Sequence, residues 1–351
     1  MRTTAFSLCL LAAVAAPAAA ADSFPAAGLA GLRLDSEAAF AGIYGSTLPV
    51  ILVEQLGDNA EFFSVRMEAV KGRLEIKAAL KPEKKKEYEE RLRRHNSFLL
   101  GLFSKDSKAP ETGFRIQLPG GRDAEVTLRD GNIEISGLRG KVAARSDTGS
   151  ISISRVTGAV EAAARTGKLE VSDIEGPVAL EGGTSSVSAE RVAGDARVKT
   201  GTGSIGVKAI GGGADLAANT GSIRIDGVSG PLKAVSGTGS IKGETASAKV
   251  EARTNTGSIA LSGLTGGAAA DCGTGSVTLA WDKAPAGGAA EASADTGSIS
   301  LSFPSDARLR ADLSSGTGSV RSEFENFQGE GVFKVTAKAG TGSVKLVKTR
   351  N

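Results

Sequence analysis

Few residues of this chain have side chains suited to catalysis. His95 is the only histidine, and Cys272 is the only cysteine outside an apolar N-terminal stretch that holds Cys9. A Ser-His-Asp triad would need His95, from a segment with a helical pattern, to reach a serine and an acid elsewhere in the chain. A zinc site is disfavoured by one histidine and one cysteine. We therefore expect neither a triad nor a zinc centre, and no cofactor.

Carboxylates offer a second route to chemistry, because polysaccharide lyases on parallel β-helices use calcium-binding acids and a basic residue. The acids expected to point outward are scattered here and do not cluster on adjacent repeats: Glu134, Glu170, Glu190, Asp226 and Glu244. The glycine-rich nonapeptide that binds calcium is also missing, since Gly211–Asp215 has no match in the next repeat. A non-enzymatic protein is the leading hypothesis, with a polysaccharide-active enzyme as the alternative.

A repeated tetrad, Thr-Gly-Ser-Ile or Thr-Gly-Ser-Val, organises the part of the chain that holds Cys272 and these acids. It begins at Thr148, Thr202, Thr220, Thr238, Thr256, Thr274, Thr296, Thr317 and Thr341. Looser copies begin at Asp130, Thr166 and Thr184, and from 130 to 274 the step is 18 residues every time. A fixed period of this kind indicates a solenoid, in which each repeat buries its apolar face against its neighbours.

Each repeat contains two short clusters of alternating apolar residues. In the repeat that begins at Thr220 they are Ile223, Ile225, Val228, Leu232 and Ala234. Spacing by two indicates strands with one buried face. The residue before the tetrad threonine is mostly Gly, Asn or Asp, types that tolerate φ > 0. We predict an all-β fold, a parallel β-helix of about twelve short coils, with corners at the tetrad and at a second glycine ten residues later.

The tetrad itself is interpreted as scaffold. Its isoleucine enters the core, its glycine helps to form the corner, and its hydroxyl groups are expected to form ladders that bond to neighbouring backbone. Cys272 stands where other repeats have Ser146, Thr200, Ser236 or Thr254, so we expect a small ladder residue there.

The N-terminus has the pattern of a signal peptide over residues 1–21. Arg2 precedes an apolar run from Ala5 to Ala16, and small residues follow. We expect an exported mature chain, in the periplasm, on the cell surface or outside the cell. With Cys272 alone it can form no intramolecular disulfide. No later stretch approaches the roughly 18 apolar residues of a membrane helix, so we expect no transmembrane segment in the mature chain.

Residues 22–128 are predicted to form strands that cap the solenoid of residues 129–351, and a charged helical insert over 81–112 interrupts them. We expect its helix to span about 82 to 103, with Pro82 in the first turn. One stripe at helical spacing holds Tyr88, Leu92, His95, Leu99 and Leu102. We expect the stripe to pack on the solenoid. The alternative is that Tyr88, Leu92, Leu99 and Leu102 dock a partner or a membrane surface.

The strand Phe114–Leu118 followed by Pro119-Gly120, the coil from Val126 to Leu138, and the repeated Thr-Gly-Ser corners resemble the bacterial putative-adhesin family of unknown function. The resemblance covers roughly residues 60–351, apart from the insert. It implies a β-helical stack of short coils in an envelope-associated, non-enzymatic surface or binding module. The family defines no functional residues that could be transferred to this chain.

The charge of the chain limits its partners. Lys and Arg total 42 against 39 acidic residues, a formal net charge of +3, which does not favour nucleic acid. The leading hypothesis is an exported adhesive or structural module with an unknown envelope or extracellular partner, protein or glycan. A third hypothesis takes the threonine ladder as a surface that matches ice or a mineral. It is the weakest, since each coil offers one threonine at a corner.

Overall fold

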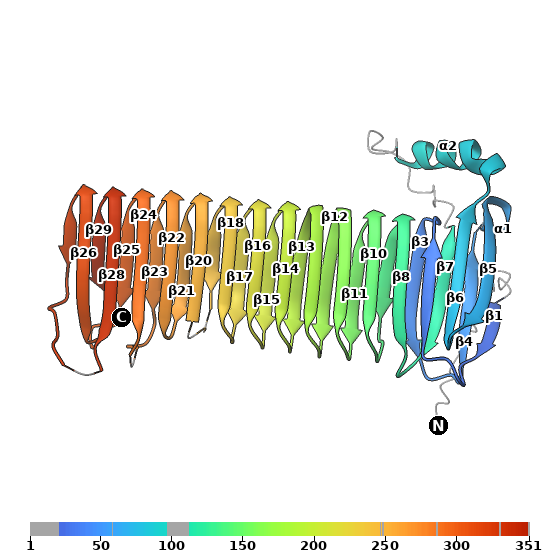
Figure 1. Cartoon of the computed structure of the whole chain (residues 1–351), viewed down its shortest axis with the longest axis horizontal. Helices are drawn as coiled ribbons and strands as arrows, with labels where there is room; N and C mark the ends of the chain where they lie inside the picture. Colours follow the sequence, from blue (N-terminus) through green and yellow to red (C-terminus); the bar gives the residue numbers. More distant parts are fainter. Residues whose placement is uncertain are drawn as a thin grey trace, which may run out of the picture.

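The computed structural model describes residues 21–57, 59–96, 112–245, 247, 249–285, 287–329 and 331–349; for 91–96 only the backbone is described. The described residues are nearly all in strands that stack along one axis (Figure 1). The prediction of an all-β parallel solenoid is confirmed. The expected signal peptide lies outside the described residues, except for Ala21.

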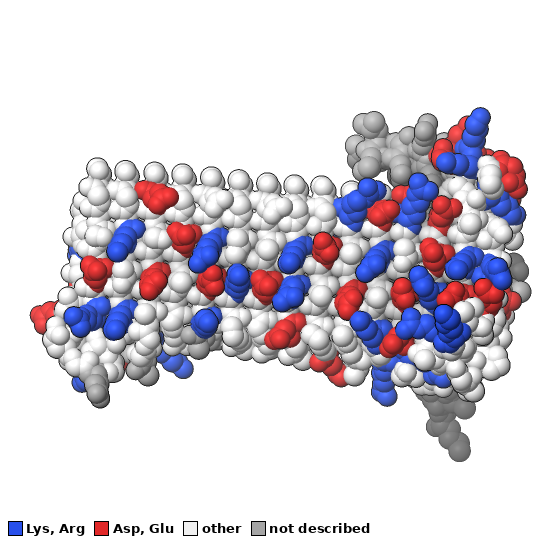
Figure 2. All heavy atoms as spheres, viewed as in Figure 1, with Lys and Arg blue, Asp and Glu red and all other residues white. Residues whose placement is uncertain are grey.

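Two sheets form the stack. The strands that end at the tetrad corner, together with β6 (Arg73–Leu80) and β2 (Gly31–Ser36) at the N-terminal end, make the front sheet, seen face-on in Figure 2. In spatial order they are β6, β2, β8 (Asp123–Asp130), β10 (Val142–Thr148), the first halves of β12 (Val160–Ile174) and β13 (Val178–Val192), β14 (Ala196–Thr202), β16 (Ala214–Thr220), β18 (Leu232–Thr238), β20 (Lys249–Thr256), β22 (Gly267–Thr274), β24 (Ala289–Thr296), β28 (Phe333–Thr341) and β26 (Leu309–Thr317).

The strands that begin after the corner make the back sheet. In the same order they are β7 (Gly113–Pro119), β3 (Phe40–Ser46), β9 (Asn132–Ser136), β11 (Ile151–Val156), the second halves of β12 and β13, β15 (Ile205–Ile210), β17 (Ile223–Val228), β19 (Ile241–Glu244), β21 (Ile259–Leu264), β23 (Val277–Trp281), β25 (Ile299–Phe303), β29 (Val344–Lys348) and β27 (Val320–Ser322). The described residues thus form the twelve coils expected from the tetrads and two more, from β2/β3 and β6/β7.

The chain does not enter the stack in sequence order. β2 pairs in parallel with both β6 and β8, and β3 pairs with both β7 and β9. The coil β2/β3 therefore lies between β6/β7 and β8/β9. Antiparallel strands cover this end, because β5 (Phe63–Val70) pairs with β6, β4 (Val50–Leu56) with β7, and β1 (Ala21–Pro25) with β4.

The C-terminal end repeats this arrangement. β28 pairs in parallel with both β24 and β26, and β29 pairs with both β25 and β27. The last coil of the sequence, β28/β29, is therefore the next-to-last layer of the stack. The coil β26/β27, which precedes it in the chain, forms the end.

The core lies between the two sheets and is filled by the predicted apolar positions. Ile223, Ile225, Val228, Leu232 and Ala234 are each at most 2% exposed. Full burial of one such aliphatic side chain larger than alanine contributes about 1.5–3 kcal/mol. Larger rings fill the core near the C-terminal end: Trp281, Phe303 and Phe333 are each 0% exposed, and the rings of Trp281 and Phe303 stack with centroids 4.1 Å apart.

The tetrad glycine makes the corner. Its φ lies between +133° and +147° in Gly149, Gly167, Gly203, Gly221, Gly239, Gly257, Gly275, Gly297, Gly318 and Gly342. A Cβ on Gly221 would also lie closer than 3.0 Å to the carbonyl oxygen of Gly203 in the preceding coil. The expectation for the residue before threonine was wrong, because none of the described ones has a positive φ. The left-handed turn is made one residue after threonine, where only glycine fits against the next backbone.

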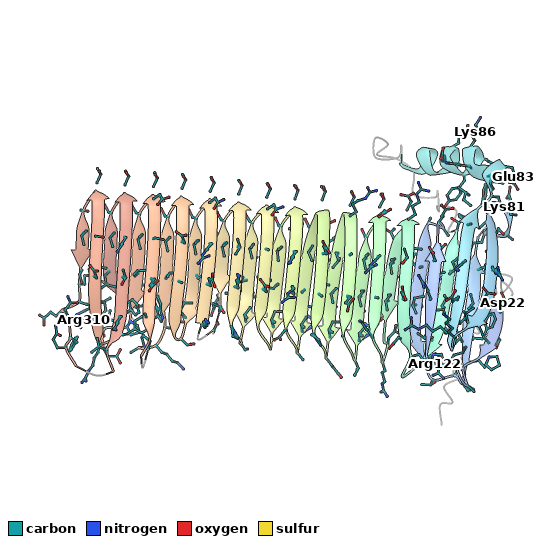
Figure 3. All side chains as sticks on the ribbon, viewed as in Figure 1. Asp22, Lys81, Glu83, Lys86, Arg122 and Arg310 are labelled. Carbon is teal, nitrogen blue, oxygen red and sulfur yellow. The ribbon has the colours of Figure 1, made fainter. Side chains whose placement is uncertain are left out.

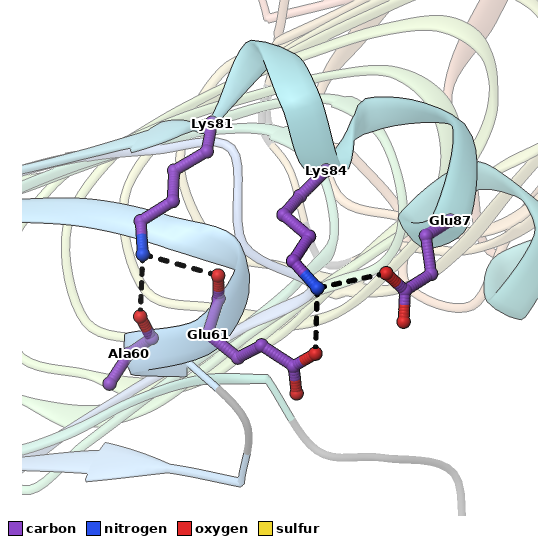
Figure 4. Close-up of polar contacts among 5 residues, drawn as sticks. All are labelled: Ala60, Glu61, Lys81, Lys84 and Glu87. Carbon is purple, nitrogen blue, oxygen red and sulfur yellow. Dashed lines mark hydrogen bonds and ion pairs between the residues drawn. The ribbon is translucent and has the colours of Figure 1, made fainter.

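The helical insert replaces the corner of the coil β6/β7. It begins with a 3-10 turn (Pro82–Lys84) and helix α2 (Lys85–Asn96). The remainder of the helix predicted to reach 103 lies outside the described residues. Lys81 donates from Nζ to the carbonyl oxygens of Ala60 and Glu61, both in the short helix α1 (Asn59–Phe62). Lys84 Nζ donates to the carboxylates of Glu61 and Glu87 (Figure 4). These contacts hold the start of α2 on the end of the stack.

Candidate binding face

The outer surface of the front sheet carries two rows of charged side chains. One row contains Glu161, Arg197, Asp215, Lys233, Glu251 and Glu291, and the other contains Arg145, Glu181, Lys199, Arg253, Asp271 and Lys338. Because the strands pair in register at each step, side chains of equivalent positions stack directly over one another. Charges of both signs are mixed along each row (Figure 2).

Ion pairs join neighbouring coils across this face. Lys141 Nζ lies 2.8 Å from Glu161 Oε1, and Arg197 Nε lies 3.5 Å from Asp215 Oδ2. The hydrogen bond from Lys141 lowers the pKa of Glu161, and the same bond raises the pKa of Lys141. Each pair is largely exposed, so its contribution to stability is small. Their main effect is to keep the face charged and polar.

Hollows separate the charged side chains, because small residues alternate with them: Ala143, Ala163, Ala179, Ala217 and Ala269. One hollow of about 530 Å³ has Ala163 and Gly182 in its lining, with Arg145 and Glu181 beside them. A second hollow, of about 620 Å³, lies above Ala196 and Gly213.

The second hollow combines an apolar lining with charges of both signs. Pro177 and Pro231 line it, together with Arg197, Asp215 and Lys233. These hollows were not predicted from the sequence. The signal was present in the aligned repeats, where alanine and charged residues alternate at equivalent outward positions.

The serine of the tetrad forms the expected ladder. The Ser240 N–H donates to Ser222 Oγ at 3.3 Å, and the Ser258 N–H donates to Ser240 Oγ at 3.3 Å. The tetrad threonines are also in register, with Thr202, Thr220 and Thr238 paired, and they are exposed. Their hydroxyl groups make no hydrogen bond to any described residue, so the expectation that both hydroxyls bond to backbone holds for serine alone.

Cys272 takes the inner ladder position, as expected. Its Sγ donates to the carbonyl oxygen of Gly257 at 3.0 Å, as Ser236 Oγ does to Gly221 and Thr254 Oγ1 to Gly239. The side chain is 0% exposed. Burial raises the pKa of the thiol, and the charges of Asp271 and Asp295 raise it further.

We expect Cys272 to be unreactive in the folded protein, because the thiolate is the nucleophile and burial disfavours it. A colourless disulfide reagent that releases a chromophore should label Cys272 only when denaturant unfolds the stack. Cys272→Ser should change the free energy of unfolding by no more than about 1 kcal/mol, since serine makes the same bond elsewhere. Fast labelling without denaturant would contradict this placement.

The stripe of the insert is resolved in part. Tyr88 is 6% exposed and packs against Phe62 and Phe63, with ring centroids 5.5 and 5.1 Å away. Its hydroxyl lies 3.2 Å from Thr112 Oγ1. Tyr88 thus faces the stack and is not available to dock a partner. The side chain of Leu92 is not described, and Leu99 and Leu102 lie outside the described residues.

The back face holds a feature that was not predicted from the sequence. Arg155, Asp173, Arg191 and Ala209 occupy the same position in successive coils, and each has a φ between +52° and +57°. Glycine holds this position in other coils, as Gly137, Gly227 and Gly263. Arg191 binds Asp173 through Nε at 2.6 Å and Nη2 at 3.0 Å. The glycines at aligned positions were the available signal.

Within the described ranges, no group of three or more histidine, cysteine or acidic side chains is placed to hold a metal ion. No described helix has both the length and the apolar character needed to cross a membrane.

Comparison with known proteins identifies the family. The family model Toastrack DUF4097 matches residues 91–349, most of the chain. The protein belongs to this family. The resemblance noted from the Thr-Gly-Ser corners is confirmed, and the Toastrack match spans every tetrad, which ties the repeats to the family.

No curated protein matches this Toastrack chain. Among solved structures, a putative cell adhesion protein from Clostridium sporogenes ATCC 15579 aligns over 94% of this chain and 99% of its own, with 11% identity and a TM-score of 0.19. At that score the alignment does not establish a similar arrangement of the two chains.

Proposed function

We propose that this Toastrack protein is an exported, non-enzymatic binding module whose front face contacts an envelope or extracellular partner. The observation that carries the proposal is the front face itself, where charges of both signs surround hollows floored by alanine and glycine. Such a surface suits a partner with many polar groups, either a protein or a glycan. Export is proposed from the signal-peptide pattern of residues 1–21.

Because the coils repeat, the proposed binding site extends along the length of the stack. Similar hollows recur along the stack, including one beside Arg253, Asp271 and Lys338 near the C-terminal end. An extended partner could contact several of them at once, and contacts that are individually weak then add through effective concentration. We place specificity in the pattern of charges, because the coils themselves are nearly identical.

The proposal is tested by two matched triple variants. We expect Arg197→Ala, Lys199→Ala and Lys233→Ala together to weaken capture of an envelope partner or an arrayed glycan at least tenfold. The control is Lys208→Ala, Arg224→Ala and Lys242→Ala, which removes three exposed bases from the back face. Each triple also removes one member of an ion pair, Arg197–Asp215 or Lys208–Asp226. Equal binding by both variants would contradict the front-face site.

The alternative hypothesis, a polysaccharide-active enzyme, is tested by incubating the protein with the same arrayed glycans. Release of a shortened product that is abolished by changing one front-face acid, such as Glu181→Gln, would overturn the non-enzymatic proposal. The ice or mineral hypothesis stays the weakest. Each coil from Thr148 onward contributes one exposed threonine at a corner, and tetrad serines such as Ser222 and Ser240 are already bonded into a ladder.

A further inference from the structure

The C-terminal end of the stack differs from every inner layer in its core positions. Val320 of β27 is 46% exposed, although Val344, its partner in the next layer, is 0% exposed. Leu313 of β26 is partly exposed, whereas its partner Ala337 is 0% exposed. Phe327 adds a ring that is 44% exposed. An apolar surface therefore closes the rod at this end.

The edge of β26 is covered only in its first half. The loop after β27 folds over it, so that the Ala311 N–H donates to Asn326 Oδ1 at 2.7 Å and Asn326 Nδ2 donates to the Ala311 carbonyl at 3.3 Å. The Phe327 N–H also donates to the Leu309 carbonyl at 2.9 Å. Main-chain N–H and C=O groups alternate in direction along a strand. Those of Leu313 and Ser315 therefore point to the same outer side as those of Leu309 and Ala311. No described residue bonds to them there.

The other end of the rod is built differently. Antiparallel β5 covers β6, and β4 and β1 cover β7. On the outer strand β5, Arg66 and Glu68 form an ion pair at 2.9 Å, and charges of this kind protect an edge from further pairing. The two ends lie at opposite extremes of the stack, as the labels of Arg310 and Lys81 show (Figure 3). Pairing of the C-terminal end of one molecule with the N-terminal end of another is therefore disfavoured.

From these observations we infer that the C-terminal end binds the same end of a second copy of this chain. The two β26 strands pair antiparallel about Ser314, so that Leu313 of each copy exchanges main-chain hydrogen bonds with Ser315 of the other. Leu313, Val320 and Phe327 are buried in the interface. A two-fold contact of this kind closes on itself and does not propagate.

The charges of β26 are compatible with this pairing. Side chains of Arg310, Asp312 and Ser314 point to the front face. With Ser314 opposite its own copy, Asp312 lies opposite Gly316, and the loop that carries Asn326 and Phe327 ends the pairing before Arg310. Like charges directly opposite each other would destabilise an antiparallel pair, and this register has none.

Sedimentation of the purified chain over a range of concentrations tests the inference. We expect a dimer that Leu313→Pro weakens at least tenfold without loss of folding, because proline removes only an N–H at the open edge. Val320→Arg should weaken it as well, by placing a charge in the apolar surface. The matched control is Ser152→Arg, an exposed residue on the back face far from this end. A wild-type monomer at high concentration, or a dimer unaffected by both variants, would overturn the inference.

A crosslink tests the register. Opposed residues in a non-hydrogen-bonded antiparallel pair have Cβ atoms about 4.5–5.5 Å apart, close to the separation that a disulfide needs. Ser314→Cys should therefore form an intermolecular disulfide under mild oxidation, whereas Ser152→Cys should not. The buried Cys272 does not compete. A dimer whose Ser314→Cys form does not crosslink would contradict the pairing about Ser314.

Discussion

Alanine in place of Gly221 should lower the free energy of unfolding by at least about 3 kcal/mol. The φ of this residue is +145°, and an added Cβ would meet the carbonyl oxygen of Gly203. Neither problem can relax locally, because Gly203 and Gly239 hold the same conformation in the layers on either side. Urea unfolding followed by circular dichroism measures the effect.

Gly206→Ala is the control for this prediction. Gly206 lies in β15, one coil before Gly221, and an added Cβ there would meet no atom within 4 Å. We expect its free energy of unfolding to change by less than about 0.5 kcal/mol. If both alanine variants unfold at the same urea concentration, close approach at the corner is not what requires the tetrad glycine.

Removal of residues 332–351 should disrupt the C-terminal end of the rod. This truncation deletes β28 and β29, which lie between the end coil β26/β27 and the coil β24/β25. It also removes Phe333, whose ring centroid lies 5.9 Å from that of Trp281. Loss of one buried phenylalanine costs about 3–5 kcal/mol. Because the chain has a single tryptophan, its emission should shift to longer wavelength.

Excision of residues 309–331 is the matched control, and it should leave the rod folded. It removes the end coil, and the step from Thr296 to Thr341 falls to 22 residues, the same as the step from Thr274 to Thr296. The residues to be joined are already close, since the Phe333 N–H donates to the Arg308 carbonyl at 3.0 Å. Similar tryptophan emission from both deletions would contradict the observed order of layers.

The repeat explains why so much of the stack could be predicted. A side chain between two sheets must be apolar, and strand alternation places such residues two apart, so Ile223 and Ile225 identify a buried face without further information. In-register stacking then carries the assignment from one coil to the next. Cys272 was assigned in the same way, by its place among Ser236 and Thr254.

The ends could not be predicted from the same signals. Val320 and Val344 follow identical Thr-Gly-Ser corners, yet one is exposed at the end and the other is buried. Which coil occupies the end depends on long-range strand pairing. The local sequence of neither strand indicates which of the two coils is terminal. The corner conformation was misassigned for a related reason, because the constraint on the tetrad glycine comes from a backbone 18 residues away.

The placement of β29 also determines how the rod would respond to force. The strand is bonded to β25 on one side and to β27 on the other. A pull on the C-terminus would therefore load an interior layer, and extraction would have to break two ladders of hydrogen bonds at once. A terminal strand at a free edge would instead peel away from one neighbour. The mechanical strength of this end is thus set by the order in which the chain fills its layers.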